Sequence, residues 1–552
     1  MDVPKVNVIE RGKASSAPSI NISYFVNERF LIIVVLVLAS VFVRLYDLDK
    51  QGLECDEMYT ISAANGQHYV YFNSQSQFRS ANFPTTIEEY DRLLTPQFHS
   101  SVSDVTGVLR RNVQMPLYFY VMHYWLKWAG TSEWAARFPS VVFGTLAVLI
   151  TFLLGKEMFG AFIGFVSALL MSMMPEQIYF SQQARTYPLL VLIMVTATYS
   201  VILSQKFPDS VKPRLLFFAA SACGFYSHYL YLFCIAAHAL YIWIISPLGK
   251  RHPRAWILTF VSIAAALVPW ALLVSLDQQR TSSDIIGWAH DDLIFGSLRG
   301  RVISNILGIV SVPEIPFGWL TAVLAYGLVL LGAVSLRSDR LKLWLLCSSI
   351  ALPIAGILAM DIALDTHSVI MVRYWLVITP ALYMLMVCGI DWITKLGRRP
   401  IWRVAVILTL TAFGGWAAIN TARGELRPKP DLHRDLAQFL QDHLEDPNNE
   451  FIMTEGLNSI PLAIAYYSRG AAQRQINMVS LNWAIDPANK RELRAIMLPR
   501  KDVWLVISGR SKGGSMLKNT GYQLYEDPQR FGHVSVFHYR RSDLSQTQAD
   551  AK

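Results

Sequence analysis

Long apolar runs alternate with short polar connections along most of the first 420 residues of the chain. Several of these runs approach the 20 or so residues that an α-helix needs to cross about 30 Å of hydrocarbon. We predict about eleven membrane-spanning helices, at residues 30–45, 138–154, 161–174, 187–203, 215–225, 229–245, 256–276, 317–336, 343–360, 375–393 and 402–419. The pattern therefore predicts a mainly α protein, a polytopic membrane helical bundle.

The segment 116–128 is apolar and aromatic but short for a membrane crossing, and it contains His123 and Lys127. Aromatic residues at this density are typical of the membrane interface, so we expect an interfacial helix, with a true crossing as the alternative. Basic residues gather in every second connection, which places those connections in the cytoplasm. The alternation is regular only if 116–128 does not cross. The N-terminus is then cytoplasmic and the C-terminus external.

The same pattern divides the chain into three parts. Residues 1–29 form a polar, cytoplasmic N-terminal tail, and residues 30–420 form the transmembrane domain, whose first outer connection is 46–137. In residues 421–552 charge rises and helical and strand patterns alternate, which predicts a small α/β domain on the outer face. We expect strands at 450–454, 502–508 and 533–539 and helices at 431–444 and 460–468. Its role stays open between a structural module and an acceptor-docking module.

Composition supports a membrane protein and excludes other classes. The chain has 552 residues, of which 53% are hydrophobic and 16% charged, whereas a soluble domain has about 25% charged residues. The net charge of +9 does not indicate nucleic-acid binding, because the basic residues lie in short loops between apolar runs. The five cysteines show no disulfide framework.

The first candidate chemistry lies just after the first predicted span, where Asp56 and Glu57 stand at the edge of the hydrocarbon. Ionisable groups at such a position are costly and usually functional. The Asp56 carboxylate could act as a general base or hold a divalent cation. The alternative is that both residues are ordinary solvated loop residues.

Further polar and aromatic residues recur on the outer side of the predicted bundle. Arg185 and Arg373 could bind a phosphate group with their planar guanidinium forks, or they could snorkel to lipid headgroups. A lone histidine such as His228 is more often a satisfied interface residue than a catalyst. The candidate substrate-binding residues are Tyr59, Arg79, Gln182, Tyr187, His228 and Tyr229. The sequence shows no Walker loop, dinucleotide fingerprint or zinc-ligand spacing, which disfavours a protein driven by nucleotide hydrolysis.

The order of these motifs resembles a known group of enzymes over roughly residues 30–380. The motifs are Asp56-Glu57, Gln114-Met115-Pro116-Leu117-Tyr118, Glu133-x-x-x-Arg137-Phe138-Pro139-Ser140, Gly155-Lys156-x-x-Phe159-Gly160, Ser181-Gln182-x-Ala184-Arg185-x-Tyr187, His228-Tyr229 and Arg373-Tyr374-x-x-x-x-x-Pro380. They are similar to those of the bacterial family-39-like enzymes of the GT-C glycosyltransferase superfamily. These enzymes are related to the protein mannosyltransferases and to the lipid A aminoarabinose transferases.

The resemblance implies an inverting transferase that uses a polyprenyl-phosphate sugar donor at the periplasmic face of the bacterial inner membrane. The acceptor would be an envelope component: lipid A, a glycolipid, a polysaccharide or a protein. The resemblance also implies that Asp56 is the general base, that Glu57 is its acidic neighbour, and that Arg185, Arg373 and Tyr374 bind the donor phosphate.

The chain departs from the family pattern at two positions. Met115 stands where the family often has a second proline, and Gln183 stands where it often has a glutamate. The second departure removes a carboxylate, so we predict no metal site, although a divalent cation stays an open alternative. The partners implied are the sugar donor, the envelope acceptor and membrane lipids, without nucleic acid. The rival function is a polytopic lipid or sugar transporter or flippase, which would favour ionisable residues near the bilayer midplane.

Overall fold

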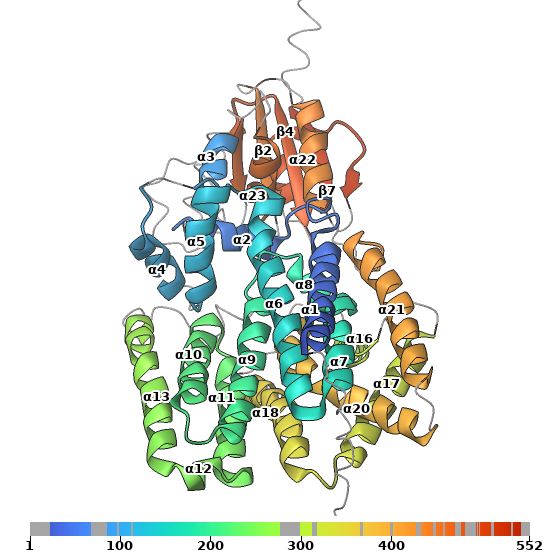
Figure 1. Cartoon of the computed structure of the whole chain (residues 1–552). Helices are drawn as coiled ribbons and strands as arrows, with labels where there is room; N and C mark the ends of the chain where they lie inside the picture. Colours follow the sequence, from blue (N-terminus) through green and yellow to red (C-terminus); the bar gives the residue numbers. More distant parts are fainter. Residues whose placement is uncertain are drawn as a thin grey trace, which may run out of the picture.

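The computed structural model combines a helical bundle with a sheet domain at one end (Figure 1). The residues it describes are 22–67, 85–96, 99–111, 114–275, 298–311, 317–364, 368–397, 401–426, 432–444, 446, 449–455, 459–469, 476–480, 493, 495, 497–508, 513–531 and 534–541.

The bundle has a helix at each of the eleven ranges that the hydrophobic pattern predicts. They are α1 (Ile22–Leu45), α6 (Glu133–Phe159), α7 (Ala161–Met173), α9 (Tyr187–Lys206), α10 (Val211–Ser227), α11 (Tyr231–Leu240) with its continuation η3 (Tyr241–Ile245), α13 (Pro253–Ser275), α17 (Gly318–Ser335), α18 (Arg340–Leu364), α20 (Thr379–Leu396) and α21 (Ile401–Ala422). Among the described residues, seven helices are long and apolar enough to cross a membrane, and one bent pair makes up to eight. The predicted membrane bundle is confirmed.

The bent pair joins α7 to α8 (Pro175–Ser181) at an angle of 58°. Met174 between them is extended, because a residue before proline is disfavoured in the α conformation, whereas Pro175 fits the first turn of a new helix. The break turns α8 toward the end of the bundle beside the sheet domain, which we call the outer end. It thereby places the connection 182–186, which carries Arg185, beside α2 (Cys55–Ala64).

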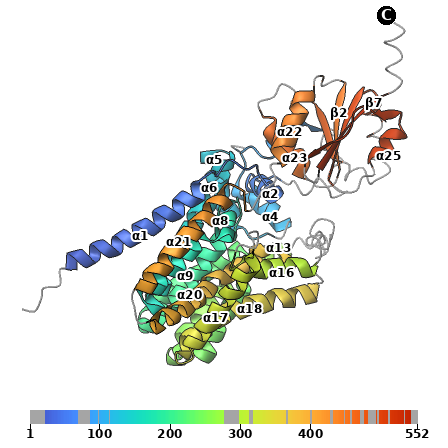
Figure 2. The ribbon, with the colours of Figure 1, turned by 90° about the vertical axis from the view of Figure 1, so that its right-hand side faces the viewer.

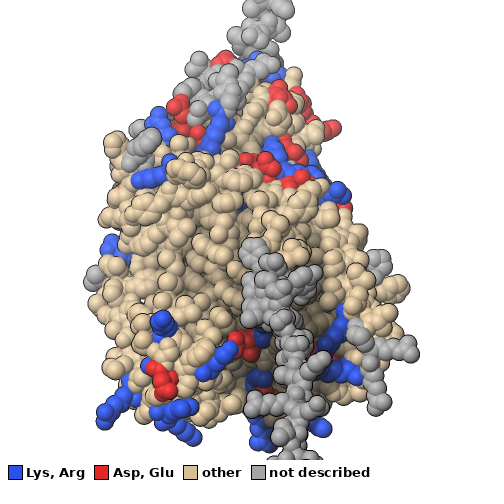
Figure 3. Space-filling view, viewed as in Figure 1, with Lys and Arg blue, Asp and Glu red and all other residues tan. Residues whose placement is uncertain are grey.

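Charged side chains are distributed unevenly over the surface of the bundle (Figure 3). On the face shown in Figure 3, a broad belt of the bundle is almost free of charge, and lysine and arginine gather at the end opposite the sheet domain. The helix ends and short turns at that end carry the basic residues Lys156, Lys206, Lys250, Arg251, Arg337, Arg340 and Lys395. An uncharged belt of this kind is what a bilayer core requires.

Four short helices lie between the bundle and the sheet domain (Figure 1). They are α2, α3 (Ile87–Arg92), α4 (Val102–Arg111) and α5 (Leu117–Ala129). The 13 residues of α5 are too few to cross about 30 Å of hydrocarbon, and α5 stands at the end of α10 rather than within the bundle (Figure 1). Trp128 on α5 is 80% exposed. The interfacial position of this helix stays a prediction.

Within the part of the chain that the structure describes, the sheet domain has seven strands in the order β1-β3-β2-β4-β7-β5, with β6 paired to β7. The strands are β1 (Thr85–Thr86), β2 (Glu450–Glu455), β3 (Asn477–Ser480), β4 (Asp502–Ser508), β5 (Tyr522–Leu524), β6 (Gln529–Phe531) and β7 (Val534–Arg541). The three strands β3, β2 and β4 are parallel, and the other pairs are antiparallel. The predicted strands and helices after residue 421 are confirmed, but β1 comes from the connection 46–137, so the sheet is not built from the C-terminal region alone.

Helices α22 (Leu432–His443) and α23 (Ser459–Tyr467) lie on the side of the sheet nearer the bundle (Figure 2). A further helix of this domain is α25 (Gly513–Lys518). The amphipathic α22 and the apolar α23 pack together and bury leucine and alanine side chains that reach 0% exposure. These two helices therefore form the surface through which the domain contacts the outer end of the bundle.

The rest of the outer end is made by short elements that lead into the last spans. They are α16 (Leu298–Gly308), η5 (Ser368–Ile370), α19 (Val372–Trp375) and η6 (Leu376–Ile378). The short helix α12 (Leu248–Arg251) lies at the opposite, basic end of the bundle (Figure 1). The helix α20 approaches α17 closely, because a Cβ at Gly389 would lie 2.1 Å from the carbonyl oxygen of Leu328. This contact fixes the position of α20 and, through η6, of α19, which contains Arg373.

Candidate active site

The candidate site begins at the first turn of α2, the helix that follows the acidic stretch. Glu54 is its N-cap residue in an extended conformation, and its backbone amide donates to the Glu57 carboxylate over 2.9 Å. The carboxylates of Asp56 and Glu57 both lie in the first turn, where the positive end of the helix dipole stabilises negative charge. The acidic sequence thus explains both where the helix starts and where its two carboxylates point.

Glu57 forms a buried, bidentate ion pair with Arg137 of α6. Nε and Nη2 of Arg137 each donate to Glu57 over 2.8 Å, and the two side chains are 0% and 1% exposed. The remaining Arg137 hydrogens bind the backbone carbonyl groups of Leu48, Gln51 and Gly52 at 2.7 Å. Every charge in this pair is therefore matched inside the protein.

The same carboxylate also positions the connection that contains Arg185. The backbone amide of Ala184 donates to Glu57 Oε1 over 2.8 Å. From α6, the Ser140 hydroxyl donates to the carbonyl oxygen of Arg185 over 3.0 Å, and Tyr118 of α5 bonds to Ser140 at 2.8 Å. Glu57 therefore joins α2, α6 and the connection 182–186 into one rigid unit.

Asp56 lies on a different side of α2 and meets two arginines. Nη1 of Arg373 donates to Asp56 Oδ2 over 2.7 Å, and Nη2 of Arg185 lies 3.4 Å from the same oxygen. Arg185 Nη1 also donates to the Asp56 carbonyl oxygen at 3.0 Å and to the Thr60 hydroxyl at 3.2 Å. Three residues that together span more than 300 positions of the sequence are thus brought into direct contact.

This cluster of Asp56, Arg185 and Arg373 is positively charged and partly open. One carboxylate faces two guanidinium groups, and the Asp56 side chain is 35% exposed. Burial raises the pKa of the Asp56 carboxyl group, but the positive charges of Arg185 and Arg373 outweigh it and hold the pKa below its ordinary value. The net positive charge makes the cluster suitable for an anionic ligand.

An aromatic wall made by Tyr187, His228 and Tyr374 surrounds the two arginines. The His228 ring lies 5.8 Å from Tyr187 and 5.4 Å from Tyr374, and both guanidinium groups lie within 6 Å of the Tyr187 ring. Burial, with the positive charges of Arg185 and Arg373, lowers the pKa of His228 to about 3. His228 is therefore neutral, and because its Nδ1 accepts from the backbone amide of Leu230 over 3.2 Å, its proton resides on Nε2.

The other predicted residues lie around this centre in different ways. Gln182 is 4% exposed and donates to the carbonyl oxygen of Tyr46, which makes it a support of the chain before α2. Tyr59 lies one turn after Asp56 on α2, and Tyr229, which is 39% exposed, follows His228. Arg79 lies outside the described residues.

Two residues that the sequence analysis gave no role belong to the site. Thr60 lies four positions after Asp56 on α2 and accepts from Arg185, and this helical spacing was the signal that could have found it. Glu54 accepts from the Tyr179 hydroxyl at 2.7 Å and from the Gln183 amide at 3.0 Å. The Gln183 that replaces a glutamate of the family pattern therefore acts as a hydrogen-bond donor beside the site.

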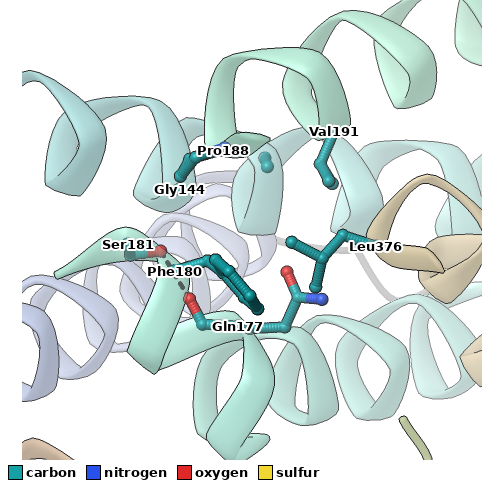
Figure 4. A pocket seen from close by; sticks show the side chains of 8 residues that line it. Gly144, Gln177, Phe180, Ser181, Pro188, Val191 and Leu376 are labelled. Atoms are coloured by element: carbon teal, nitrogen blue, oxygen red, sulfur yellow. Dashed lines mark hydrogen bonds between the residues drawn. The ribbon is translucent and has the colours of Figure 1, made fainter. Parts of the chain in front are cut away.

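No other candidate centre competes with this one among the described residues. They contain no group of three or more histidine, cysteine, aspartate or glutamate side chains that could hold a metal ion. A small cavity inside the bundle has a mainly apolar lining with Gln177 and Ser181 as its polar members, and none of the candidate site residues lines it (Figure 4). The two guanidinium groups against Asp56 also repel a cation, so the geometry favours an anion.

Comparisons with known proteins agree with the fold and the motif order. The sequence profile of the dolichyl-phosphate-mannose-protein mannosyltransferase family matches residues 113–273. Among solved structures, ArnT from Cupriavidus metallidurans in the apo state is similar with a TM-score of 0.55 and 14% identity, covering 93% of this chain and 98% of that chain. The structure of the same enzyme bound to undecaprenyl phosphate is similar with a TM-score of 0.53 and 14% identity, covering 92% of this chain and 97% of that chain. No curated protein sequence matches the chain.

These similarities define the class of fold. The chain has the GT-C fold of the ArnT structures, which is the fold that the motif resemblance implied. The ArnT structures extend over nearly the whole chain, so the fold includes the sheet domain as well as the bundle.

Proposed function

We propose that this protein is an inverting glycosyltransferase that moves a sugar from a polyprenyl-phosphate donor to an envelope acceptor. The observation that carries the proposal is the half-open cluster of Asp56, Arg185 and Arg373 at the outer end of a GT-C bundle. It combines a potential base with two phosphate-binding groups. The solved ArnT structure bound to undecaprenyl phosphate supports this donor class.

Arg185 and Arg373 bind the donor phosphate and act on the leaving group. As the acceptor oxygen or nitrogen attacks the anomeric carbon, the bond from that carbon to the phosphate oxygen breaks and its electron pair stays on the phosphate. The two guanidinium groups stabilise this developing charge, which is where electrostatic catalysis is most effective. The neutral His228, with its proton on Nε2, and Tyr374 stand beside the same arginines and complete the polar wall.

Asp56 receives the proton of the acceptor. In the structure its carboxylate is held by both arginines, which lower its pKa and make it a weak base. A bound phosphate competes for the same guanidinium groups and offsets their positive charge, so it releases Asp56 and raises its basicity. Glu57, in contrast, is fully engaged by Arg137 and acts as a positioning residue that holds α2 in place.

We further propose that the reaction takes place at the periplasmic face of the bacterial inner membrane. The basic connections gather at the end of the bundle opposite the site, and such connections face the cytoplasm. We accordingly propose a cytoplasmic tail at residues 1–29, a membrane domain at 30–420 and a periplasmic domain at 421–552. The acceptor is an envelope lipid, glycan or protein.

The test is release of polyprenyl phosphate by the purified protein in lipid, with a panel of polyprenyl-phosphate sugars and an envelope extract as acceptor. Asp56→Asn should lower turnover by about 10²–10⁴-fold, the range typical of a lost general base. It should leave folding intact because the change is nearly isosteric. Asp442→Asn on α22, an exposed aspartate outside the site, is the matched control and should keep full activity.

Normal turnover in Asp56→Asn would remove the base assignment. A folded protein that binds polyprenyl lipids but releases no phosphate with any donor would contradict the transferase and favour the transporter or flippase.

A further inference from the structure

The short segment 48–53, which leads into α2 and Asp56, is held by hydrogen bonds from both the bundle and the sheet domain. On the bundle side, Arg137 binds three of its carbonyl groups, as described above. These bonds hold the middle and the beginning of the segment. They leave the backbone groups of Leu53, which directly precedes the N-cap residue of α2, to other partners.

The sheet domain supplies those partners from α22 and the end of α23. The backbone amide of Leu53 donates to the Tyr467 hydroxyl over 2.7 Å, and Nδ1 of His433 lies 3.1 Å from the Leu53 carbonyl oxygen. Because a carbonyl oxygen only accepts, Nδ1 of His433 is the donor. Arg434 adds bonds to the carbonyl groups of Lys50 at 2.9 Å and Asp49 at 3.1 Å.

The domain is itself anchored close to this point. Arg434 forms an ion pair with Glu133 at 2.9 Å, at the first turn of α6. The Tyr466 hydroxyl donates to the carbonyl oxygen of Thr131 at 2.8 Å, and Arg469 pairs with Asp91 of α3 at 2.6 Å. Leu53 and His433 are 1% and 8% exposed, so the contact is dry. The sheet domain is therefore fixed to the same helices that frame the site.

We propose that the sheet domain is a positioning element of the active site, and that His433 and Tyr467 set the position of Asp56 by clamping Leu53. The inference rests on the proposed function, because it assigns a role toward the same base. Leu53 precedes α2 by two residues, so a shift of its peptide groups moves the first turn and the Asp56 carboxylate with it. Displacement of a reacting group by about 1 Å can lower a rate by about 100-fold.

The clamp predicts a specific kinetic signature. His433 and Tyr467 touch neither arginine of the phosphate-binding pair in any contact that the described residues show, so their loss should lower kcat and leave the donor KM unchanged. Removing one hydrogen bond of ordinary strength changes an equilibrium or rate constant by about fivefold. We expect Tyr467→Phe to lower kcat by about that factor, and the double variant His433→Leu/Tyr467→Phe to lower it by about tenfold or more.

Two controls separate positioning from general damage. Tyr522→Phe removes a buried tyrosine hydroxyl within the sheet domain that bonds to the carbonyl groups of Met497 and Arg500, far along the chain from Leu53. It should leave kcat unchanged. His433→Asn keeps an amide donor near the place of Nδ1 and should restore most of the activity lost in His433→Leu.

A second readout does not depend on turnover. Cys55 directly precedes Asp56 at the start of α2, and Cys234 and Cys388 are buried. In a full-length chain with Cys223→Ser and Cys347→Ser, alkylation of Cys55 by a small maleimide reports how well the first turn of α2 is held. Tyr467→Phe should accelerate this alkylation about fivefold, and Tyr522→Phe should not.

The possible outcomes test the clamping of Leu53 separately from the proposed transfer reaction. Faster Cys55 alkylation and lower kcat at constant KM support the proposal. Unchanged alkylation in the double variant, or an equal loss of kcat in Tyr522→Phe, would overturn it even when the parent is fully active. A parent that releases no polyprenyl phosphate would refute the proposed function, whereas the alkylation rates would still decide whether Leu53 is clamped.

Discussion

Two neighbouring carboxylates, Asp56 and Glu57, meet arginines in opposite ways. Glu57 and Arg137 form a dry pair of one anion and one cation, both at most 1% exposed. Asp56 faces two guanidinium groups and keeps 35% of its side chain exposed. Balanced and buried charges hold a structure together, whereas unbalanced and accessible charges can exchange their partner for a ligand. The contrast separates the support of the site from its reactive part.

Helix geometry produces this separation from two adjacent residues. Successive side chains on an α-helix point about 100° apart, since there are 3.6 residues per turn. Glu57 therefore points into the bundle toward α6 while Asp56 points toward the connection 182–186 and α19. The comparison predicts that the two carboxylates respond differently to substitution, in stability for one and in turnover for the other.

The largest effect on stability should come from breaking the balanced pair. Arg137→Met leaves Glu57 buried without its cation, and removing one partner of a buried pair costs about 3–5 kcal/mol. The backbone carbonyl groups of Leu48, Gln51 and Gly52 also lose their donor. Thermal unfolding in lipid nanodiscs measures the change.

Lys206→Met is the control for this prediction. It breaks the ion pair between Lys206 and Glu157, whose side chains are 51% and 27% exposed. The loss of stability should therefore be about 1 kcal/mol or less. Equal losses of stability in the two variants would mean that the Glu57–Arg137 pair is no more structural than a surface ion pair.

A smaller effect, confined to the donor, should follow from removing one cation of the unbalanced cluster. Arg373→Ala deletes a charged hydrogen-bond donor, and such bonds are worth about 1.5–3 kcal/mol. The donor KM should therefore rise by about 10–100-fold, while the protein stays folded because the Asp56 carboxylate keeps Arg185 and solvent as partners. Titration with a polyprenyl-phosphate sugar measures the change.

Arg423→Ala, an exposed arginine near the end of α21 that contacts Tyr46, is the matched control. It should leave the donor titration unchanged. A titration that is also unchanged in Arg373→Ala would indicate that Arg373 serves lipid headgroups instead of the donor.

Much of the fold could be predicted because membrane helices are recognised in a sequence by their long apolar runs. All eleven predicted ranges contain a helix, and the strand β4 has the predicted bounds. The bend between α7 and α8 could also be expected from Pro175, but its direction depends on packing that hydropathy does not describe. The strand β1 could not be predicted, because two residues leave no alternating pattern.

Most of the residues that the structure gathers around Asp56 were candidates from the sequence, but Thr60 and the partner of each carboxylate were not. Arg185, Tyr187, His228, Arg373 and Tyr374 recur at span ends, and the structure brings them around Asp56. The residue pattern could not separate Asp56 from Glu57, since adjacent carboxylates have the same chemistry until their partners are known; only the family resemblance distinguished them. The clamp on Leu53 was invisible for another reason: it acts on backbone groups, which every residue carries.

The last and smallest effect is a shift of the pH profile, which sharpens the comparison without abolishing activity. Arg185 and Arg373 hold the pKa of Asp56 in the free protein below its ordinary value, so its basic form persists as the pH falls. The quantity that reports the free enzyme, kcat/KM, is therefore lost only below that pKa. Arg185→Gln removes one of the two charges, so the acid limb of kcat/KM should move to higher pH. Glu133→Gln, which changes a carboxylate outside the cluster, should leave the limb in place. His228, with a pKa of about 3, stays neutral and contributes no limb near neutral pH. An acid limb at the same pH in Arg185→Gln and in the parent would mean that the titrating base is not Asp56.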